Sequence, residues 1–219
     1  MNHADRTQLT AMHALLKRRQ DEILGAKPVG SLWKKRRGAR RTLLCLSHPR
    51  LGVKTGRKGV GMWNVKAHGI ASHAGLNPEA GASAILELAR HIFRFHSMSD
   101  PASGTNFNVG VVRGGTRSNV VAAEAEIEID VRFTSMKEAQ RVDELMSSLR
   151  SFDERVQLAI KGGINRGPLE RTEGVVKLYQ HARDIAACLS FELGEQSVGG
   201  ASDGNFVAAL MYRSSTGLE

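Results

Sequence analysis

Two histidines, His68 and His73, stand in the segment NVKAHGIASHAGLNPEAG, residues 64–81, where an alternating pattern gives way to a helical one. His73 is flanked by Ser72 and Gly75, and a histidine in such a loop can project into a cleft and donate a hydrogen bond to a developing oxyanion. A donor of this kind contributes about 3 kcal/mol at a distance of about 3 Å. The alternative interpretation is a solvated loop histidine. His68 fits a half-buried strand position.

Arginines and glycine-rich turns offer further polar groups. Arg132 ends an alternating segment, and an arginine beside a cleft forms a bidentate pair with a substrate carboxylate. Pairing of Arg132 with Asp130 or Glu128 is an equally good interpretation. The glycines of GGASDGNFVAAL, residues 199–210, either expose backbone N–H groups to an anion or form a plain tight turn.

The hydrophobic periodicity predicts the elements that position these residues. Strands are expected at 61–70, 105–115, 119–133 and 155–164, and helices at 78–98 and 134–152. Pro78 occupies a position typical of a helix start, and Thr134 or Ser135, with Glu138 three residues beyond Ser135, is the expected N-cap of the second helix. The order is β-α-β-β-α-β. We therefore expect an α+β fold in which two helices cover one face of an antiparallel sheet, a split βαβ arrangement.

The remaining chain divides around this unit into three predicted regions. Residues 1–60 have no clear amphipathic period, residues 61–168 form the sandwich, and residues 169–219 carry a helix at 172–191, a short strand at 192–198 and a helix start after the glycine turn. The last region cannot bury its apolar faces by itself.

The net charge of +9 is concentrated at the start of the chain. Residues 1–60 hold 15 of the 31 Lys and Arg and only 3 of the 22 Asp and Glu. The segment WKKRRGARR, residues 33–41, has the charge to attract phosphates, but a solvated run is the commoner interpretation and no aromatic stacking platform accompanies it. Nucleic acid is therefore not an expected partner.

Compartment is indicated by the cysteines and the hydropathy. Cys45 and Cys188 have no disulfide-framework spacing, which suits a reducing compartment. No apolar run reaches the ~20 residues of a membrane span, and the first residues lack a signal-peptide pattern. We expect a cytoplasmic chain that has no membrane as a partner.

Four stretches together resemble the zinc aminoacylase, acetylornithine deacetylase and carboxypeptidase G family of metallopeptidases and amidohydrolases. They are GIASHAGLNPEAGASAI, GGTRSNVVAAEAEIEIDVR, NRGPLE and GGASDGNFVAAL. In that family a βαββαβ lid, which is also the dimerisation domain, is inserted in a larger α/β zinc-binding catalytic domain.

The resemblance implies roles for individual residues. It implies that His73 is the lid histidine that reaches across a homodimer and polarises the scissile carbonyl in the partner's active site. It further implies that seven residues contact a small amino-acid-derived substrate or face it: Asn119, Arg132, Arg166, Gly200, Ser202, Asp203 and Asn205.

Departures from the family pattern concern its metal ligands. A two-zinc hydrolase needs a full ligand set, because two metals about 3.5–4 Å apart must be held while one water is activated. DEILGA, residues 21–26, aligns with the stretch that carries the general base, which makes Glu22 the base and places Ile23 where a metal-binding Glu belongs. The LLCLSHP stretch places His48 at another ligand position, and histidine binds zinc whereas isoleucine does not. Chance similarity remains the alternative for both matches.

These departures shape the functional expectation. We expect a truncated member of this zinc-dependent family, which hydrolyses an amide bond to release an amino acid, with deficient catalysis and no stoichiometric zinc. Whether the chain is an enzyme stays open. The alternative is a non-catalytic dimerisation module that pairs with itself or with a full-length relative.

Overall fold

The computed structural model describes residues 46–47, 52–190, 192–201, 204–206 and 208. The chain divides into two compact units. We call Arg57–Glu170 with Gly199–Glu219 the sandwich unit, and Met1–Gly56 with Arg171–Val198 the small unit.

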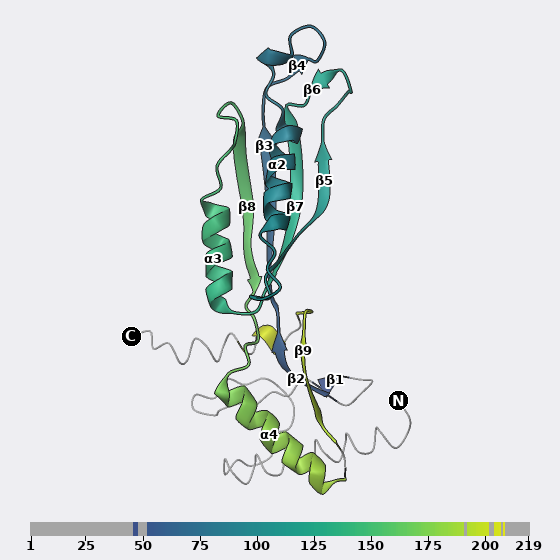
Figure 1. Ribbon diagram of the computed structural model, residues 1–219, viewed down its shortest axis with the longest axis vertical. Helices are drawn as coiled ribbons and strands as arrows, with labels where there is room; N and C mark the ends of the chain where they lie inside the picture. The colour runs from purple at the N-terminus through teal and green to yellow at the C-terminus, as the bar shows by residue number, and fades with distance from the viewer. Residues whose placement is uncertain (1–45, 48–51, 191, 202–203, 207, 209–219) are drawn as a thin grey trace, which may run out of the picture. The chain divides into compact units, whose positions relative to one another are not determined.

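The sandwich unit contains a four-stranded antiparallel sheet with two helices on one face (Figure 1). The sheet order is β5-β7-β3-β8. Its strands are β3 (Gly59–His68), β5 (Asn106–Gly114), β7 (Glu124–Phe133) and β8 (Gln157–Arg166), and its helices are α2 (Ala84–Ser97) and α3 (Met136–Ser147). The predicted α+β class and the βαββαβ order are confirmed.

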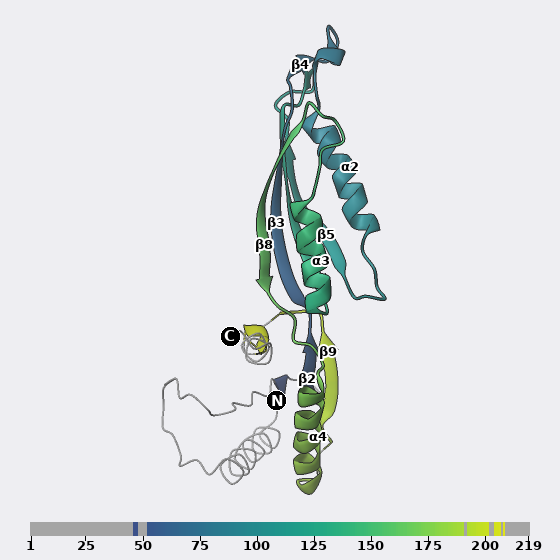
Figure 2. The same cartoon turned by 90° about the vertical axis from the view of Figure 1, so that its left-hand side faces the viewer.

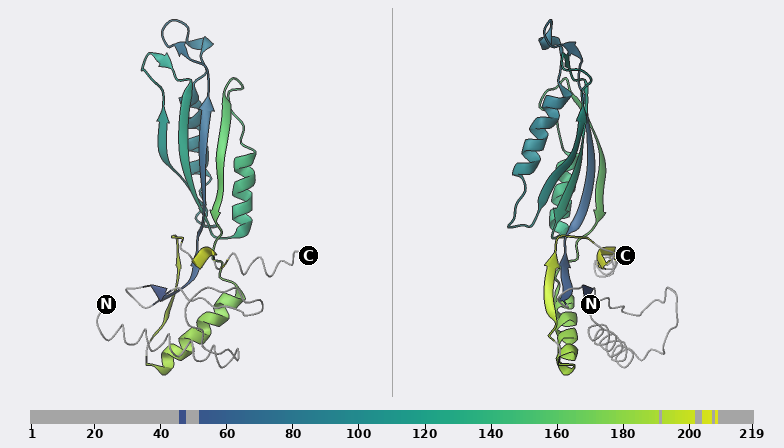
Figure 3. Two further views of the ribbon diagram at one scale, coloured as in Figure 1. Left: turned by 180° about the vertical axis from the view of Figure 1, so that it is seen from behind. Right: turned by 90° about the vertical axis from the view of Figure 1, so that its right-hand side faces the viewer.

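Strand alternation decides which face of the sheet is covered. In β7 the inward residues Ile127, Ile129 and Val131 are buried, whereas Glu126 and Glu128 point to the other face and pair with Lys66 and Arg113. Side views show α2 and α3 on one side of the sheet, and the view from behind shows the other side bare (Figures 2 and 3). Each fully buried aliphatic side chain contributes about 1.5–3 kcal/mol, so this face holds the unit together.

Helix α2 of the sandwich unit starts later than the position of Pro78 predicts. Pro78 begins a short 3₁₀ turn, η1 (Pro78–Ala80), which is broken at Gly81. The α-helix starts only at Ala84, where Ser83 is the N-cap and its side chain accepts a hydrogen bond from the Leu86 N–H. The Ser83 hydroxyl satisfies an N–H of the first helical turn, which a proline side chain cannot do because it has no hydrogen-bond acceptor. The predicted start at residue 78 is therefore wrong, whereas the expected cap of α3 is confirmed, with Ser135 rather than Thr134 as the residue used.

A small two-stranded ribbon follows the end of β3. It consists of β4 (Ser72–His73) and β6 (Val120–Val121), and His73 lies opposite Val120. This ribbon carries the histidine that the sequence singles out.

The small unit is built on a three-stranded sheet. It consists of β1 (Leu46–Ser47), β2 (Gly52–Arg57) and β9 (Gly194–Val198), with β2 in the middle, and α4 (Glu173–Cys188). Val53, Ala182 and Ala186 form its buried cluster with Leu193. Thr172 caps α4, and its side chain accepts a hydrogen bond from the Val175 N–H. Among the described residues, no helix has the length and apolar character needed to cross a membrane.

Candidate functional site

His73 is exposed, and its own turn holds the imidazole. The Nδ1 atom accepts hydrogen bonds from the N–H groups of Gly75 and Leu76, both at 3.1 Å. The Asn77 N–H donates to the His73 carbonyl at 3.1 Å. The ring is therefore oriented by backbone donors within four residues of chain.

Asn119 is brought next to this turn. Its carbonyl accepts a hydrogen bond from the Ala74 N–H at 3.0 Å, beside the pairing of His73 with Val120. Asn119 is an exposed residue. Two predicted site residues that are 46 positions apart in the printed sequence thus meet at one tip of the sandwich unit.

Arg132 is engaged within its own strand. Its Nε and Nη2 atoms donate to the two carboxylate oxygens of Asp130 at 2.6 and 2.8 Å. This hydrogen bonding raises the pKa of the Arg132 guanidinium, which outweighs the opposing effect of partial burial. Of the two carboxylates that the sequence left open as partners, Asp130 is the one used, and Glu128 pairs with Arg113 instead.

Arg166 lies at the same end of the sheet as Arg132. Both residues are opposite Val60 in register, one on each side of β3, which places their Cα atoms about 10 Å apart across two strand spacings. The Arg166 guanidinium lies over the ring of Phe206, 4.6 Å from its centroid. A cation this close to an aromatic face is held by the ring quadrupole.

Asn205 is a fully buried residue at this end of the sheet. Its amide nitrogen donates to the carbonyls of Gly167 at 2.8 Å and Lys58 at 3.2 Å. Arg57 donates from Nη1 to the carbonyl of the exposed Gly200 at 3.1 Å. The glycine-rich segment is thus attached to the strand ends that frame Arg166.

The two groups of predicted site residues lie far apart. Val60, opposite Arg166, and His68, at the end of β3 near the His73 turn, are eight residues apart on one strand. A strand rises about 3.3 Å per residue, so the two ends are roughly 27 Å apart. One sandwich unit therefore does not bring His73 and Arg166 to a common substrate.

The predicted base Glu22, the predicted ligand His48, and Ser202 and Asp203 lie outside the described residues. Within the described ranges, no group of three or more His, Cys, Asp or Glu is placed to hold a metal ion. The residues that the structure describes thus do not fit a zinc centre.

Sequence reasoning missed the part of the site that is made of backbone. The N–H groups of Gly75 and Leu76 fix the His73 ring, but a main-chain donor has no residue type that a motif could show. The one available signal is the glycine two residues after the histidine, which is typical of a tight turn.

Several known proteins are similar to this chain. Residues 55–154 match the model of the M20 peptidase dimerisation domain. Carboxypeptidase G2 of Pseudomonas sp. (strain RS-16) is 28% identical over 165 residues, which cover 71% of this chain and 38% of that protein. A p-aminobenzoyl-glutamate hydrolase polypeptide of Escherichia coli (strain K12) is 37% identical over 68 residues, 31% of this chain and 16% of that protein.

A solved structure has the same fold. The aminopeptidase PepT of Bacillus cereus ATCC 10987 superimposes with a TM-score of 0.58 at 22% identity, over 74% of this chain and 44% of that one. The chain spans less than half the length of these relatives. The chain is therefore similar to M20 hydrolases over part of their length, and its residues 55–154 match the peptidase dimerisation domain.

Proposed function

We propose that the chain acts as the dimerisation lid of an amide-hydrolysing M20 assembly. In this proposal His73 donates from Nε2 to the carbonyl oxygen of the scissile amide, and Arg166 pairs with a substrate carboxylate. The relative named for p-aminobenzoyl-glutamate suggests the substrate class, an N-acylated acidic amino acid. Hydrolysis releases that amino acid.

The separation of His73 from Arg166 is the observation that carries the proposal. A substrate of this class spans about 10–15 Å at full extension by backbone dimensions. His73 and Arg166 lie near opposite ends of β3, and these ends are roughly 27 Å apart. A second copy, or a full-length relative, supplies the missing half of each site. In such a shared site, the dimerisation domain contributes directly to catalysis.

The sandwich unit offers a face suited to that second copy. Its outer strand β5 is an edge of the sheet. After the register shift between Val109 and Val111, Val112 lies opposite Ile127 and thus on the helix side. Four large apolar side chains on α2 and β5 are exposed: Ile85, Leu86, Phe93 and Val112. An exposed apolar patch beside an open strand edge is typical of a protein interface.

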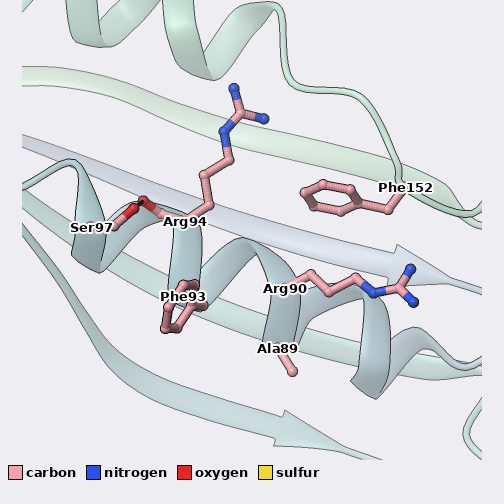
Figure 4. A pocket seen from close by; sticks show the side chains of 6 residues that line it. All are labelled: Ala89, Arg90, Phe93, Arg94, Ser97 and Phe152. Atoms are coloured by element: carbon pink, nitrogen blue, oxygen red, sulfur yellow. Dashed lines mark hydrogen bonds between the residues drawn. The ribbon is translucent and has the colours of Figure 1, made fainter.

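Phe93 is the most exposed of these, at 79%. It lines an open hollow of about 610 Å³, together with four other residues of α2 and with Phe152 from the segment after α3 (Figure 4). Leu86 and Phe93 are seven residues apart and share one side of the helix. We place the α2 helix and the β5 edge at the dimer interface.

Zinc is the metal expected from the family, which is generally metal-dependent. We propose that this chain alone hydrolyses amides poorly, because Ile23 stands where the family pattern has a metal-binding Glu and isoleucine offers no ligand atom. Losing one ligand opens a co-catalytic site and weakens the binding of both metal ions. A cytoplasmic location belongs to the same proposal, because Cys45 and Cys188 follow no disulfide spacing.

Sedimentation of the purified full chain tests the dimer. We expect a dimer for the unmodified chain and a monomer for Phe93→Asp, because a buried unpaired carboxylate in an apolar contact costs several kcal/mol. The matched control is Gln140→Asp, which adds the same charge at an exposed position of α3. A monomeric unmodified chain, or a dimer that both variants keep, would contradict this interface.

A hydrolysis assay tests the catalytic part. The zinc-supplemented chain and His73→Ala are compared on p-aminobenzoyl-glutamate. We expect little turnover by either. Robust turnover that requires His73 would mean that the chain carries a working metal site and that the proposed deficiency is wrong.

A further inference from the structure

Two donors converge on one nitrogen of His73. The N–H groups of Gly75 and Leu76 each lie 3.1 Å from Nδ1. A backbone N–H only donates, so Nδ1 must present its lone pair and carry no proton. A neutral imidazole then has its proton on Nε2. The local geometry selects one of the two tautomers.

The turn that supplies these donors is itself held in place. The Ala74 N–H donates to the Asn119 carbonyl at 3.0 Å, and the Asn77 N–H donates to the His73 carbonyl at 3.1 Å. The Ser72 hydroxyl donates to the Asn77 carbonyl. Backbone hydrogen bonds thus fix the chain on both sides of the ring.

We propose that residues 73–77 form a preset hydrogen-bond donor, in which Gly75 and Leu76 are positioning residues that hold His73 as the Nε2–H tautomer. The group that meets Nε2 must therefore be an acceptor, such as an amide carbonyl or an oxyanion. A metal ion needs a nitrogen lone pair, and Nδ1 has its lone pair occupied while Nε2 carries the proton. His73 is thus a donor to substrate and does not serve as a zinc ligand.

The same turn contributes an apolar neighbour. Leu76 is 83% exposed, the highest value among the exposed large apolar residues of the described chain. It follows His73 by three residues in the same turn. The acceptor that His73 meets is therefore expected to have an apolar group beside it, such as the acyl part of an N-acylated amino acid. This expected substrate feature rests on the proposed function.

Nitrogen NMR of the full chain, labelled with ¹⁵N in histidine, tests the tautomer at a pH where the ring is neutral. We expect the cross-peak pattern of an Nε2–H imidazole and no change of the His73 signals when zinc is added. A dominant Nδ1–H tautomer, or a zinc-induced shift of His73, would overturn the proposal.

Hydrogen exchange at the amides of Gly75 and Leu76 tests the positioning. In His73→Ala the Gly75 amide loses its acceptor, whereas the Leu76 amide keeps the His73 carbonyl at 3.3 Å. We expect exchange about fivefold faster at Gly75, the equivalent of one net hydrogen bond, and a smaller change at Leu76. In His73→Asn the side-chain oxygen can accept from an N–H two residues on, so protection should return without the imidazole. Equal exchange in the unmodified chain and in His73→Ala would overturn the assigned role.

A matched pair at residue 75 isolates the donor. Gly75→Pro removes the N–H, whereas Gly75→Ala keeps it, and a Cβ there would meet His73 only at ordinary contact distances of 3.6 and 3.7 Å. We expect the Nδ1–H fraction to rise in Gly75→Pro and not in Gly75→Ala. An unchanged tautomer ratio in folded Gly75→Pro would contradict the proposal. These measurements do not depend on dimer formation or turnover, so they separate this proposal from the proposed function.

Discussion

Glu87 and His91 form a buried pair one turn apart on α2, with Nε2 of His91 3.0 Å from Oε1 of Glu87. The Glu87 carboxylate also accepts from the N–H groups of Phe152 at 2.6 Å and Asp153 at 3.1 Å. An ionised carboxylate only accepts, so His91 donates from Nε2. Its Nδ1 is then left buried without a hydrogen-bond partner among the described residues.

The stability of the sandwich unit should fall below the ordinary pKa of histidine. Burial lowers the pKa of His91 below its usual 6.5, against the raising effect of Glu87, while Arg94 also lowers it. A lowered pKa in the folded state means that the unfolded chain binds the proton first, so stability is present above pH 6.5 and is lost as the pH falls from there. Denaturant unfolding at several pH values measures this.

The matched variant for this titration is His91→Gln, which keeps a donor toward Glu87 and does not titrate. One proton accounts for a slope of at most about 1.4 kcal/mol per pH unit. We expect the unmodified chain to lose more stability than His91→Gln between pH 7 and pH 5. Parallel curves for the two proteins would show that His91 does not titrate in this way.

Glu87→Ala should destabilise the chain by about 3 kcal/mol, because it leaves the N–H groups of Phe152 and Asp153 and the imidazole of His91 without their shared acceptor. Glu144→Ala is the control, since Glu144 is an exposed acid on α3 and surface changes stay within about 0.5 kcal/mol. Equilibrium unfolding compares the two. Similar losses for both would show that the buried acceptor has no special weight.

Periodicity predicted the sandwich unit well because burial on one face governs it. Alternation in β7 and the i, i+3, i+4 pattern of α2 follow directly from which residues meet the core. Both elements end within one residue of the predicted positions, although β7 starts five residues and α2 six residues later than predicted. The start of α2 was misplaced because the Pro78 signal competes with the Ser83 cap, and only the latter leads into the buried face.

The candidate site was less predictable. The sequence pointed to His73 and Asn119, and the structure brings them together through the β4–β6 ribbon. It could not choose a partner for Arg132, because Asp130 and Glu128 lie on the same face of β7 and the choice depends on Arg113 from a neighbouring strand. Main-chain donors, such as those on His73, have no sequence signature at all.

Gly162→Ala should cost more than about 2 kcal/mol, whereas Gly163→Ala should cost less. Gly162 has φ of +134°, and a Cβ there would lie 2.1 Å from the Met62 carbonyl oxygen. Gly163 has φ of +158° but no atom within 4 Å of its added Cβ. A backbone clash forces strands to separate, whereas an open position carries only conformational strain. Thermal or denaturant unfolding ranks the two variants, and the reverse order would contradict the assigned contact.

Asn205→Ala should destabilise the chain by about 1–3 kcal/mol, because it removes the donors to the Lys58 and Gly167 carbonyls in a fully buried place. Asn205→Asp should cost more, since it turns a carboxylate oxygen toward two carbonyl oxygens that can only accept. The control is Asn108→Ala, at an exposed position of β5. Denaturant unfolding gives the order. If Asn205→Asp were as stable as the unmodified chain, the amide would not be a structural donor, and its role as a substrate contact would be the better interpretation.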